Sequence, residues 1–316
     1  MTQNVLALIA LPPQTHAALA ARYALQYHPE GPDGLVLSDE ARSKFTAVVT
    51  NGTTGLRGAH MAKFPGLRFI CSYGAGYENI DLAQAGQLGI AVANAPNTNC
   101  DTVADHAIGL MLALCRGYAP LTQAVKRGEW NSSRSARPTL SGSTVGIIGM
   151  GRVGQAIARR AAAFDMTVCY TARTARSLVA GTFVPDVVEL ARRSDFLVAA
   201  CPGGASTRHL VNRDVLNALG PEGYLVNVAR GSVVNTSDLI FALQDGTIAG
   251  AGLDVLETEP EVPVELQVLD NVLMTPHMAG RSPAAQLKQR DALLENFAAF
   301  FEGRPLASPV RPDAAR

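Results

Sequence analysis

The second half of the chain alternates short apolar runs with helical patterns. In the stretch that follows the first run, apolar residues recur at offsets of 4, 8 and 11 from Val153, so one face of a helix is apolar. Strands separated by amphipathic helices predict a parallel, doubly wound α/β sheet. The expected strands cover residues 144–149, 167–170, 196–200, 224–228, 248–255 and 272–275.

The first part of the chain repeats the strand–helix pattern more weakly. Residues 5–10, 47–49, 69–71 and 90–93 read as strands. The segment 283–302 has a helical composition and no strand after it, so it is free to return to this first part. Turn residues lie near Pro96 and around Ser282. We therefore expect a smaller, discontinuous domain of residues 1–97 and 282–316, and a larger domain of residues 98–281.

Composition narrows the function classes. The 316 residues are enough for about two domains, and 47% of them are hydrophobic against 17% charged. Basic and acidic residues number 27 each, so we expect no nucleic-acid partner. The longest apolar run, 107–115, is far below the roughly 18 residues that span a bilayer. Five scattered cysteines without a Cys-x-x-Cys pair, and the absence of a basic N-terminal leader, favour a cytoplasmic protein without a membrane or metal site.

A glycine fingerprint, Gly149-Met-Gly151-Arg-Val-Gly154, follows the apolar run 144–149 and opens the amphipathic helix. The first glycine permits a tight turn, the second lets backbone amides approach a pyrophosphate, and the third allows close helix packing. The pattern predicts a dinucleotide site of the Rossmann type, in which Arg152 and Val153 begin the helix. The alternative is a glycine-rich turn that binds nothing.

The residues after the second strand of this domain bear on the choice of dinucleotide. No acid stands where one would bind the ribose 2′-hydroxyl, and Arg173, Thr174 and Arg176 are found there instead. A guanidinium and a hydroxyl can hold a 2′-phosphate. The sequence therefore favours NADP(H) over NAD(H), with solvated loop charges as the alternative.

Three ionisable residues come at or just beyond the carboxyl ends of later strands: Arg230, Glu259 and His277. Ligands bind at that edge of an open α/β sheet. The guanidinium of Arg230 suits a carboxylate or keto oxygen, and His277 can donate a proton if Glu259 lies beside it. A surface charge, a turn residue and a strand-end histidine are the structural alternatives.

The whole chain resembles the D-isomer-specific 2-hydroxyacid dehydrogenase family, and within it the glyoxylate/hydroxypyruvate and hydroxyphenylpyruvate reductases. The matching segments are 72–81, 149–154, 226–231, 252–260 and 275–277. The resemblance implies that Arg230, Glu259 and His277 are catalytic, and that Glu257 is not the catalytic acid. It also implies a flavodoxin-like α/β substrate domain beside the dinucleotide domain.

The resemblance extends to the binding residues. Amides of Ala75 and Gly76 would hold a substrate carboxylate, and Asp254 would lie near the nicotinamide amide. The full implied substrate set is Asn51, Gly52, Tyr73, Gly74, Ala75 and Gly76. The cofactor set adds Thr102, Cys201, Pro202, Thr207, Val228, Ala229, Asp254 and Gly280 to the fingerprint and loop residues above.

As an activity, the resemblance implies NADPH-dependent reduction of a small 2-keto acid, such as glyoxylate or hydroxypyruvate, to the (R)-2-hydroxy acid, with His277 as the proton donor. The family also implies a homodimer, for which the helix around 105–115 could supply apolar surface; a helix buried in its own domain is the alternative. A competing function is a dinucleotide-sensing binding protein, like the family's corepressors, which needs no turnover.

Overall fold

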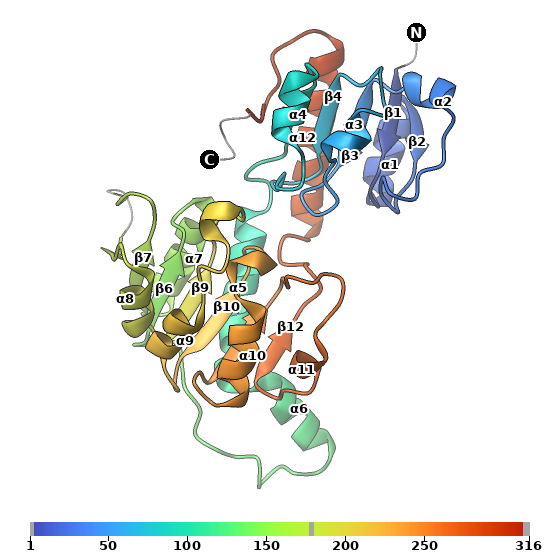
Figure 1. Ribbon diagram of the computed structural model, residues 1–316. Helices are drawn as coiled ribbons and strands as arrows, with labels where there is room; N and C mark the ends of the chain where they lie inside the picture. The colour runs from blue at the N-terminus through green and yellow to red at the C-terminus, as the bar shows by residue number, and fades with distance from the viewer. Residues whose placement is uncertain (1–2, 177–179, 312–316) are drawn as a thin grey trace. The chain divides into compact units, whose positions relative to one another are not determined.

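The computed structural model describes residues 3–176 and 180–311. The chain divides into two compact units (Figure 1). One unit comprises the residues up to Asn99 together with those from Ser282 onward, and the other comprises Cys100–Arg281. The expected breaks were after residues 97 and 281, so the first break lies two residues later in the structure.

The first unit is built on a five-stranded parallel sheet in the order β2-β1-β3-β4-β5. This is the flavodoxin-like order, in which the chain reverses direction across the sheet between β1 and β3. The sequence pattern missed β2, whose residues are only partly covered because it is an edge strand. The strands are β1 (Asn4–Ala7), β2 (Ala24–Tyr27), β3 (Ala47–Thr50), β4 (Phe69–Ser72) and β5 (Ala91–Ala93).

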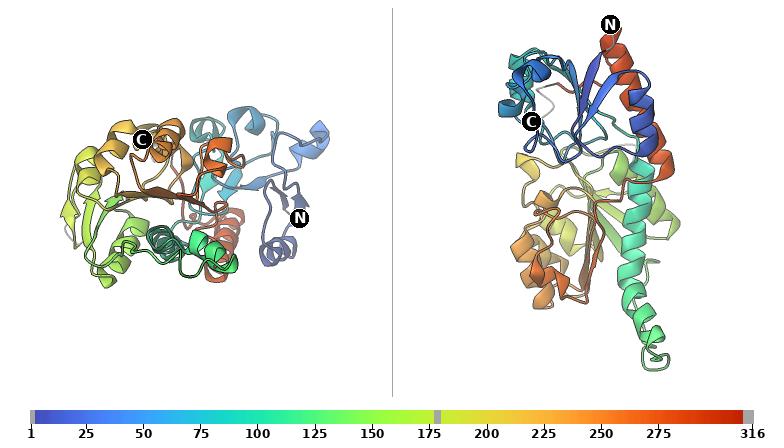
Figure 2. Two further views of the ribbon diagram at one scale, coloured as in Figure 1. Left: turned by 90° about the horizontal axis from the view of Figure 1, so that it is seen from below. Right: turned by 90° about the vertical axis from the view of Figure 1, so that its right-hand side faces the viewer.

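The final long helix belongs to this first unit, as its composition predicts. This helix, α12, lies against the sheet of the first unit (Figure 2). Its Phe297 and Phe300 pack their rings on Phe69 of β4, with centroids 5.2 and 4.6 Å apart. The buried Asn296 amide donates to the carbonyl of Asn94, which ties the helix to the end of β5. The helices of the unit are α1 (Pro13–Ala20), α2 (Asp39–Ser43), α3 (Gly58–Met61), α4 (Leu82–Gln87) and α12 (Pro283–Phe301).

The second unit contains a seven-stranded sheet in the order β12-β11-β10-β9-β6-β7-β8, with every pairing parallel. The strand order reverses between β6 and β9, which is the switch point of a Rossmann-type sheet. The predicted doubly wound fold is confirmed; only the two-residue β8 was missed. The strands are β6 (Thr144–Ile148), β7 (Thr167–Thr171), β8 (Thr182–Phe183), β9 (Phe196–Ala199), β10 (Tyr224–Asn227), β11 (Gly250–Leu253) and β12 (Val272–Met274).

Helices cover both faces of the second sheet. On one face, α5 and α7 form an apolar cluster with the strands. On the other face, α8, α9 and α10 form a second apolar cluster with the strands. Most apolar residues of α5 are buried within this unit, and Leu112 and Leu114 are partly buried against its core. The helix around 105–115 thus packs largely on its own domain, which is the alternative to an apolar dimer surface. The elements are α5 (Cys100–Arg116), α6 (Tyr118–Lys126), α7 (Arg152–Ala163), α8 (Val187–Arg192), α9 (Arg213–Leu219), α10 (Thr236–Gln244) and α11 (Val264–Gln267), with 3-10 turns at Ala205–Thr207 and Gly231–Val233.

None of the five cysteines, all of which lie in the described part of the chain, forms a disulfide, and Cys71, Cys115 and Cys169 are buried. Within residues 3–176 and 180–311, no helix is both long enough and apolar enough to cross a membrane.

Candidate active site

The glycine fingerprint forms the turn between β6 and α7. The reason why glycine is needed differs from one position of the fingerprint to the next. Gly149 has φ +99°, and a Cβ there would lie 2.7 Å from the Cα of Cys201. A Cβ on Gly154 would lie only 2.0 Å from the carbonyl oxygen of Gly149, so the helix must approach the turn closely. A Cβ on Gly151 would meet no described atom within 4 Å. The protein's own packing therefore requires glycine at 149 and 154, but not at 151.

The start of α7 fits a dinucleotide pyrophosphate. Gly151 is the N-cap residue and supplies no side-chain cap to the helix amides. The first amides of a helix lack intrahelical partners and carry partial positive charge, so they suit an anion. Arg152 is exposed in the first turn, and Val153 packs on the core of the unit. A side chain at Gly151 would stand where a ligand meets these amides.

Gly154→Ala is expected to destabilise the second unit, because the added methyl group collides with backbone. Overpacking of this kind costs about 1–3 kcal/mol, or a fall of several degrees in the unfolding midpoint. Gly151→Ala is the matched control: it should keep the midpoint and weaken dinucleotide binding. Calorimetric unfolding of the two variants makes the comparison. An unchanged midpoint for Gly154→Ala would contradict this role of close packing.

The loop after β7 presents basic side chains. Arg173, Thr174 and Arg176 are all exposed, and no carboxylate lies between 171 and 176. The amide of Arg176 donates to the hydroxyl of the buried Tyr170 at 2.8 Å, which holds the loop against the end of the strand. The loop therefore presents two guanidinium groups and a hydroxyl at the carboxyl end of β7, next to the strand β6 that leads into the glycine turn.

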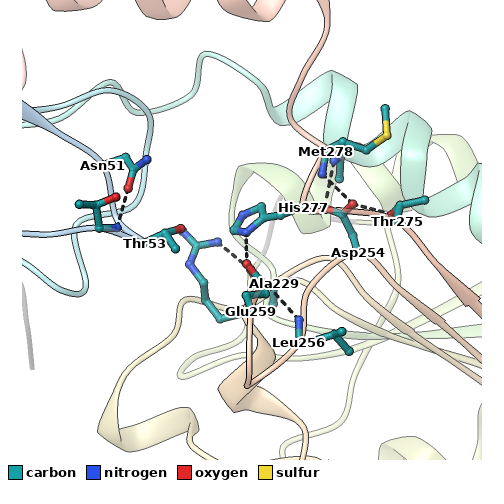
Figure 3. A network of polar contacts seen from close by, with 12 residues as sticks. Asn51, Thr53, Ala229, Asp254, Leu256, Glu259, Thr275, His277 and Met278 are labelled. Carbon is teal, nitrogen blue, oxygen red and sulfur yellow. Dashed lines mark hydrogen bonds and ion pairs between the residues drawn. The ribbon is translucent and has the colours of Figure 1, made fainter. Parts of the chain in front are cut away.

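Glu259 and His277 form a direct pair (Figure 3). The His277 ring nitrogen Nδ1 lies 2.7 Å from Glu259 Oε2, and the Leu256 amide donates to Oε1 at 2.9 Å. Burial on its own would raise the pKa of Glu259. The hydrogen bonds from His277 and Leu256 and the charges of His277 and Arg230 outweigh burial, and the pKa falls below its usual value. The carboxylate is thus ionised at neutral pH and holds the ring by one nitrogen.

Arg230 follows β10 in a turn that the side chain of Asn227 holds in place. The Asn227 side chain accepts from the Ala229 amide and donates to the Arg230 carbonyl, both at 3.0 Å. A Cβ on Gly231 would lie 2.0 Å from the backbone of Leu256, so this turn packs directly on the loop that leads to Glu259. The charge of Arg230 contributes to the low pKa of that carboxyl. The structure thus brings the three residues together at the carboxyl ends of β10, β11 and β12.

A second histidine–glutamate pair, His209 and Glu257, involves the loop that leads to Glu259 and contacts the start of α10. His209 Nε2 is 2.7 Å from Glu257 Oε1, while the amide and hydroxyl of Thr236 donate to Oε2. Burial raises the pKa of Glu257, but these hydrogen bonds outweigh it and lower the pKa. Glu257 therefore anchors its loop to the start of α10 and is not paired with His277. Spacing along the chain alone did not reveal the His209 contact.

Asp254, which is expected near the nicotinamide amide, is buried, and its carboxylate accepts three hydrogen bonds from residues that follow β12. Thr275 Oγ1 donates to Oδ1 at 2.6 Å, the Met278 amide donates to the same oxygen at 2.9 Å, and the Ala279 amide donates to Oδ2 at 2.9 Å (Figure 3). A buried carboxylate needs such partners. Asp254 therefore supports the backbone that immediately follows His277.

The remaining expected cofactor residues lie in three places of the second unit. Thr102, on α5, lines a cavity of about 390 Å³ with Met278, Ala279 and Arg281. Cys201 lies against Gly149, and burial raises the pKa of its thiol to about 11, so it stays protonated. The Thr207 hydroxyl donates to the Pro202 carbonyl at 2.8 Å. Val228 and Ala229 are buried after β10, and Gly280 is partly buried between the cavity residues Ala279 and Arg281.

Within the first unit, the structure brings the two expected substrate-binding segments into contact. A Cβ on Gly52 would lie 2.7 Å from the carbonyl carbon of Gly76. Asn51 Oδ1 accepts from the Thr54 amide at 2.7 Å, which fixes the first segment. In the second, the Tyr73 amide donates to Thr50, and Gly74 has φ +127°. The two loops therefore form one continuous surface of backbone at the ends of β3 and β4.

Comparison with known proteins gives this arrangement a class. A family model described as "D-isomer specific 2-hydroxyacid dehydrogenase, NAD binding domain" matches residues 108–279, more than half of the chain. The protein is therefore an oxidoreductase that binds a nicotinamide dinucleotide. It belongs to the D-isomer-specific 2-hydroxyacid dehydrogenase family, as the sequence resemblance implies.

Individual relatives match nearly the whole chain. The chain is 40% identical to glyoxylate/hydroxypyruvate reductase A of Arabidopsis thaliana over 92% of its length and 94% of that protein. It is 41% identical to hydroxyphenylpyruvate reductase of Plectranthus scutellarioides, covering 84% of this chain and 85% of that protein. The structure of an NADPH-dependent glyoxylate/hydroxypyruvate reductase from Sinorhizobium meliloti, in complex with NADP and malonate, matches with a TM-score of 0.91 at 37% identity, covering 98% of this chain and 97% of that one.

Proposed function

We propose that the protein reduces a small 2-keto acid, of the size of glyoxylate or hydroxypyruvate, to the 2-hydroxy acid with NADPH, and that the product has the (R) configuration wherever C2 becomes a stereocentre. The observation that carries the proposal is the 2.7 Å pair of His277 with an ionised Glu259, placed beside Arg230 at the ligand-binding edge of the sheet. The names of the relatives support the substrate class.

A dihydronicotinamide bound at the turn between β6 and α7 would supply the hydride for C2 of the keto acid. Negative charge then develops on the carbonyl oxygen, and the guanidinium of Arg230 stabilises it and orients the substrate. Because Nδ1 of His277 is held by Glu259, Nε2 is the ring nitrogen that gives its proton to that oxygen. Glu259 stabilises the positive ring before the transfer. A cation and a proton donor fixed in place favour the transition state over the ground state.

The first unit contributes the carboxylate-binding loop in this proposal. Carbonyl oxygens of Gly74, Ala75 and Gly76 accept bonds from the Ala95 amide, the Asn94 side chain and the Ser72 hydroxyl, respectively. Within residues 3–176 and 180–311, the amides of Ala75 and Gly76 donate to no backbone or side-chain acceptor. Two adjacent amides with their carbonyls turned away suit an anion. Asn51, Gly52 and Tyr73 shape the same surface.

Steady-state oxidation of NADPH and NADH, followed by the reduced nicotinamide absorbance, tests the proposal against glyoxylate, hydroxypyruvate, pyruvate and phenylpyruvate. We expect turnover with the small 2-keto acids. Tight binding of both dinucleotides without turnover of any of the four would instead favour a dinucleotide-sensing protein.

We infer a preference for NADP(H) from the basic loop after β7. Arg173→Ala is expected to weaken NADPH binding by about 10- to 100-fold, because a hydrogen bond to a charged group contributes about 1.5–3 kcal/mol. NADH binding should change little, since NADH lacks the 2′-phosphate. Titration calorimetry with both dinucleotides measures the two effects. Arg192→Ala, which removes an exposed cation of α8, is the control for overall charge. Equal losses for NADPH and NADH would disprove a phosphate-binding role.

We also propose that the protein is a homodimer. After α5 is buried in its own unit, exposed apolar side chains remain on and just after α6: Tyr118, Val125 and Trp130, which are 53, 44 and 64% exposed. Clustered exposed apolar groups are typical of a protein interface. Light scattering coupled to gel filtration should give a mass about twice the 33.2 kDa of the chain. A monomeric mass over the micromolar range would contradict the proposal.

A further inference from the structure

A histidine on α5 reaches the buried carboxylate behind the His277 loop. His106 Nε2 lies 3.0 Å from Thr275 Oγ1 and 3.6 Å from Asp254 Oδ1. Its side chain is 21% exposed and that of Asp254 is 2% exposed. His106 also lines the cavity that contains Thr102 one turn earlier on the same helix face. His106 belongs neither to the glycine fingerprint nor to the set of Arg230, Glu259 and His277, so the proposed reaction gives it no role so far.

The direction of the hydrogen bonds follows from the number of protons. The Thr275 hydroxyl has one proton, and it is directed to Asp254 Oδ1 at 2.6 Å because an ionised carboxylate only accepts. The Thr275 oxygen can then only accept from His106, so Nε2 of His106 carries a proton. The chain of bonds runs from His106 through Thr275 to Asp254 and fixes the orientation of both side chains.

The Asp254 carboxylate also accepts hydrogen bonds from the backbone that follows His277, the proposed proton donor. Both amides that follow His277, those of Met278 and Ala279, donate to Asp254 at 2.9 Å. The amide of His277 itself donates to the Asp254 carbonyl at 2.8 Å. His277 has φ +51°, a region that residues other than glycine adopt only when their surroundings hold them there. Rotation of the Asp254 carboxylate would release this backbone.

We propose that His106 is a positioning residue for the reaction. Through Thr275 it orients the Asp254 carboxylate, which holds residues 277–279 so that the His277 ring stays on Glu259. The inference rests on the proposed function, because the group positioned is its proton donor. It assigns α5 a part in the chemistry besides its packing against the sheet.

Kinetics of three variants test the role. His106→Leu removes the donor and keeps apolar bulk, and it should lower kcat by about 10- to 100-fold, since small misplacements of a reacting group have effects of this size. KM for the keto acid and for NADPH should stay near the wild-type values. His106→Gln retains an N–H donor and should restore most of kcat. Asp105→Asn, at the preceding position of α5 and paired with Arg160, is the matched control and should leave kcat unchanged, because the exposed Asp105 has no bond to Thr275 or Asp254.

A purely structural role would give a different result, with lower thermal stability and fewer active sites but no difference in kcat per active site between His106→Leu and His106→Gln. That outcome would overturn the proposal.

Hydrogen exchange tests the positioning without any turnover. In His106→Leu, the amides of Met278 and Ala279 should exchange faster, while those of β9 keep their rates. Wild-type exchange at both amides would overturn the inference even in an active enzyme. A wild-type protein that reduces none of the keto acids would refute the proposed function alone, since the exchange comparison remains valid for it.

Discussion

His277→Gln is expected to lower kcat by about 10²–10⁴-fold, the usual contribution of a positioned general acid. Glutamine can still accept or donate a hydrogen bond, but it cannot give up a proton to the alkoxide. The affinity for NADPH should persist, because the fingerprint turn between β6 and α7 does not depend on this ring. The measurement is the single-turnover rate at saturating cofactor and keto acid, together with the dissociation constant of NADPH.

A matched control for this variant is available in the first unit. His60 Nε2 lies 2.9 Å from Asp33 Oδ1, so this residue is also a histidine paired with a carboxylate. His60→Gln should retain full turnover. If His277→Gln turned over as fast as His60→Gln, the ring of His277 would have no part in proton transfer.

Arg230→Lys is expected to reduce kcat/KM for the keto acid by about 10²–10³-fold, comparable to the loss of a group that stabilises the transition-state oxyanion. Lysine keeps the charge but lacks the planar fork that matches a 2-keto acid. Arg213→Lys, on α9 and within 3.5 Å of Asp238, is the control for the same substitution elsewhere in the second unit. The ratio of kcat/KM values for the two variants is the measurement. Equal values would remove Arg230 from substrate recognition.

The sheet of the second unit and the dinucleotide turn could be predicted because both depend on local patterns. Short apolar runs predict the strands, a hydrophobic period of 3.6 residues predicts the helices, and the glycine spacing reflects backbone contacts between residues a few positions apart. The structure gives the reason at Gly154, where a side chain would strike the carbonyl of Gly149. The edge strands β2 and β8 were missed, because short and half-exposed segments carry little periodicity.

The pairing of side chains from different loops could not be predicted from spacing. Glu257 and Glu259 are two residues apart and lie in one loop, yet they contact different histidines, His209 and His277. Only the family resemblance indicated which glutamate is catalytic. Contacts of this kind depend on how separate strand ends meet in the folded sheet. His106 was missed for the same reason, since its partner Thr275 is 169 residues away.

The central claim is tested most directly with hydroxypyruvate and NADPH that carries deuterium at both C4 positions of the nicotinamide. The enantiomers of the product are separated by chiral chromatography, and their deuterium content is measured by mass spectrometry. The proposed reaction predicts (R)-glycerate with one deuterium at C2 from the wild-type protein, and almost none from His277→Gln in the same time. Glycerate of the opposite hand, or product without label at C2, would contradict direct hydride transfer to a D-2-hydroxy acid.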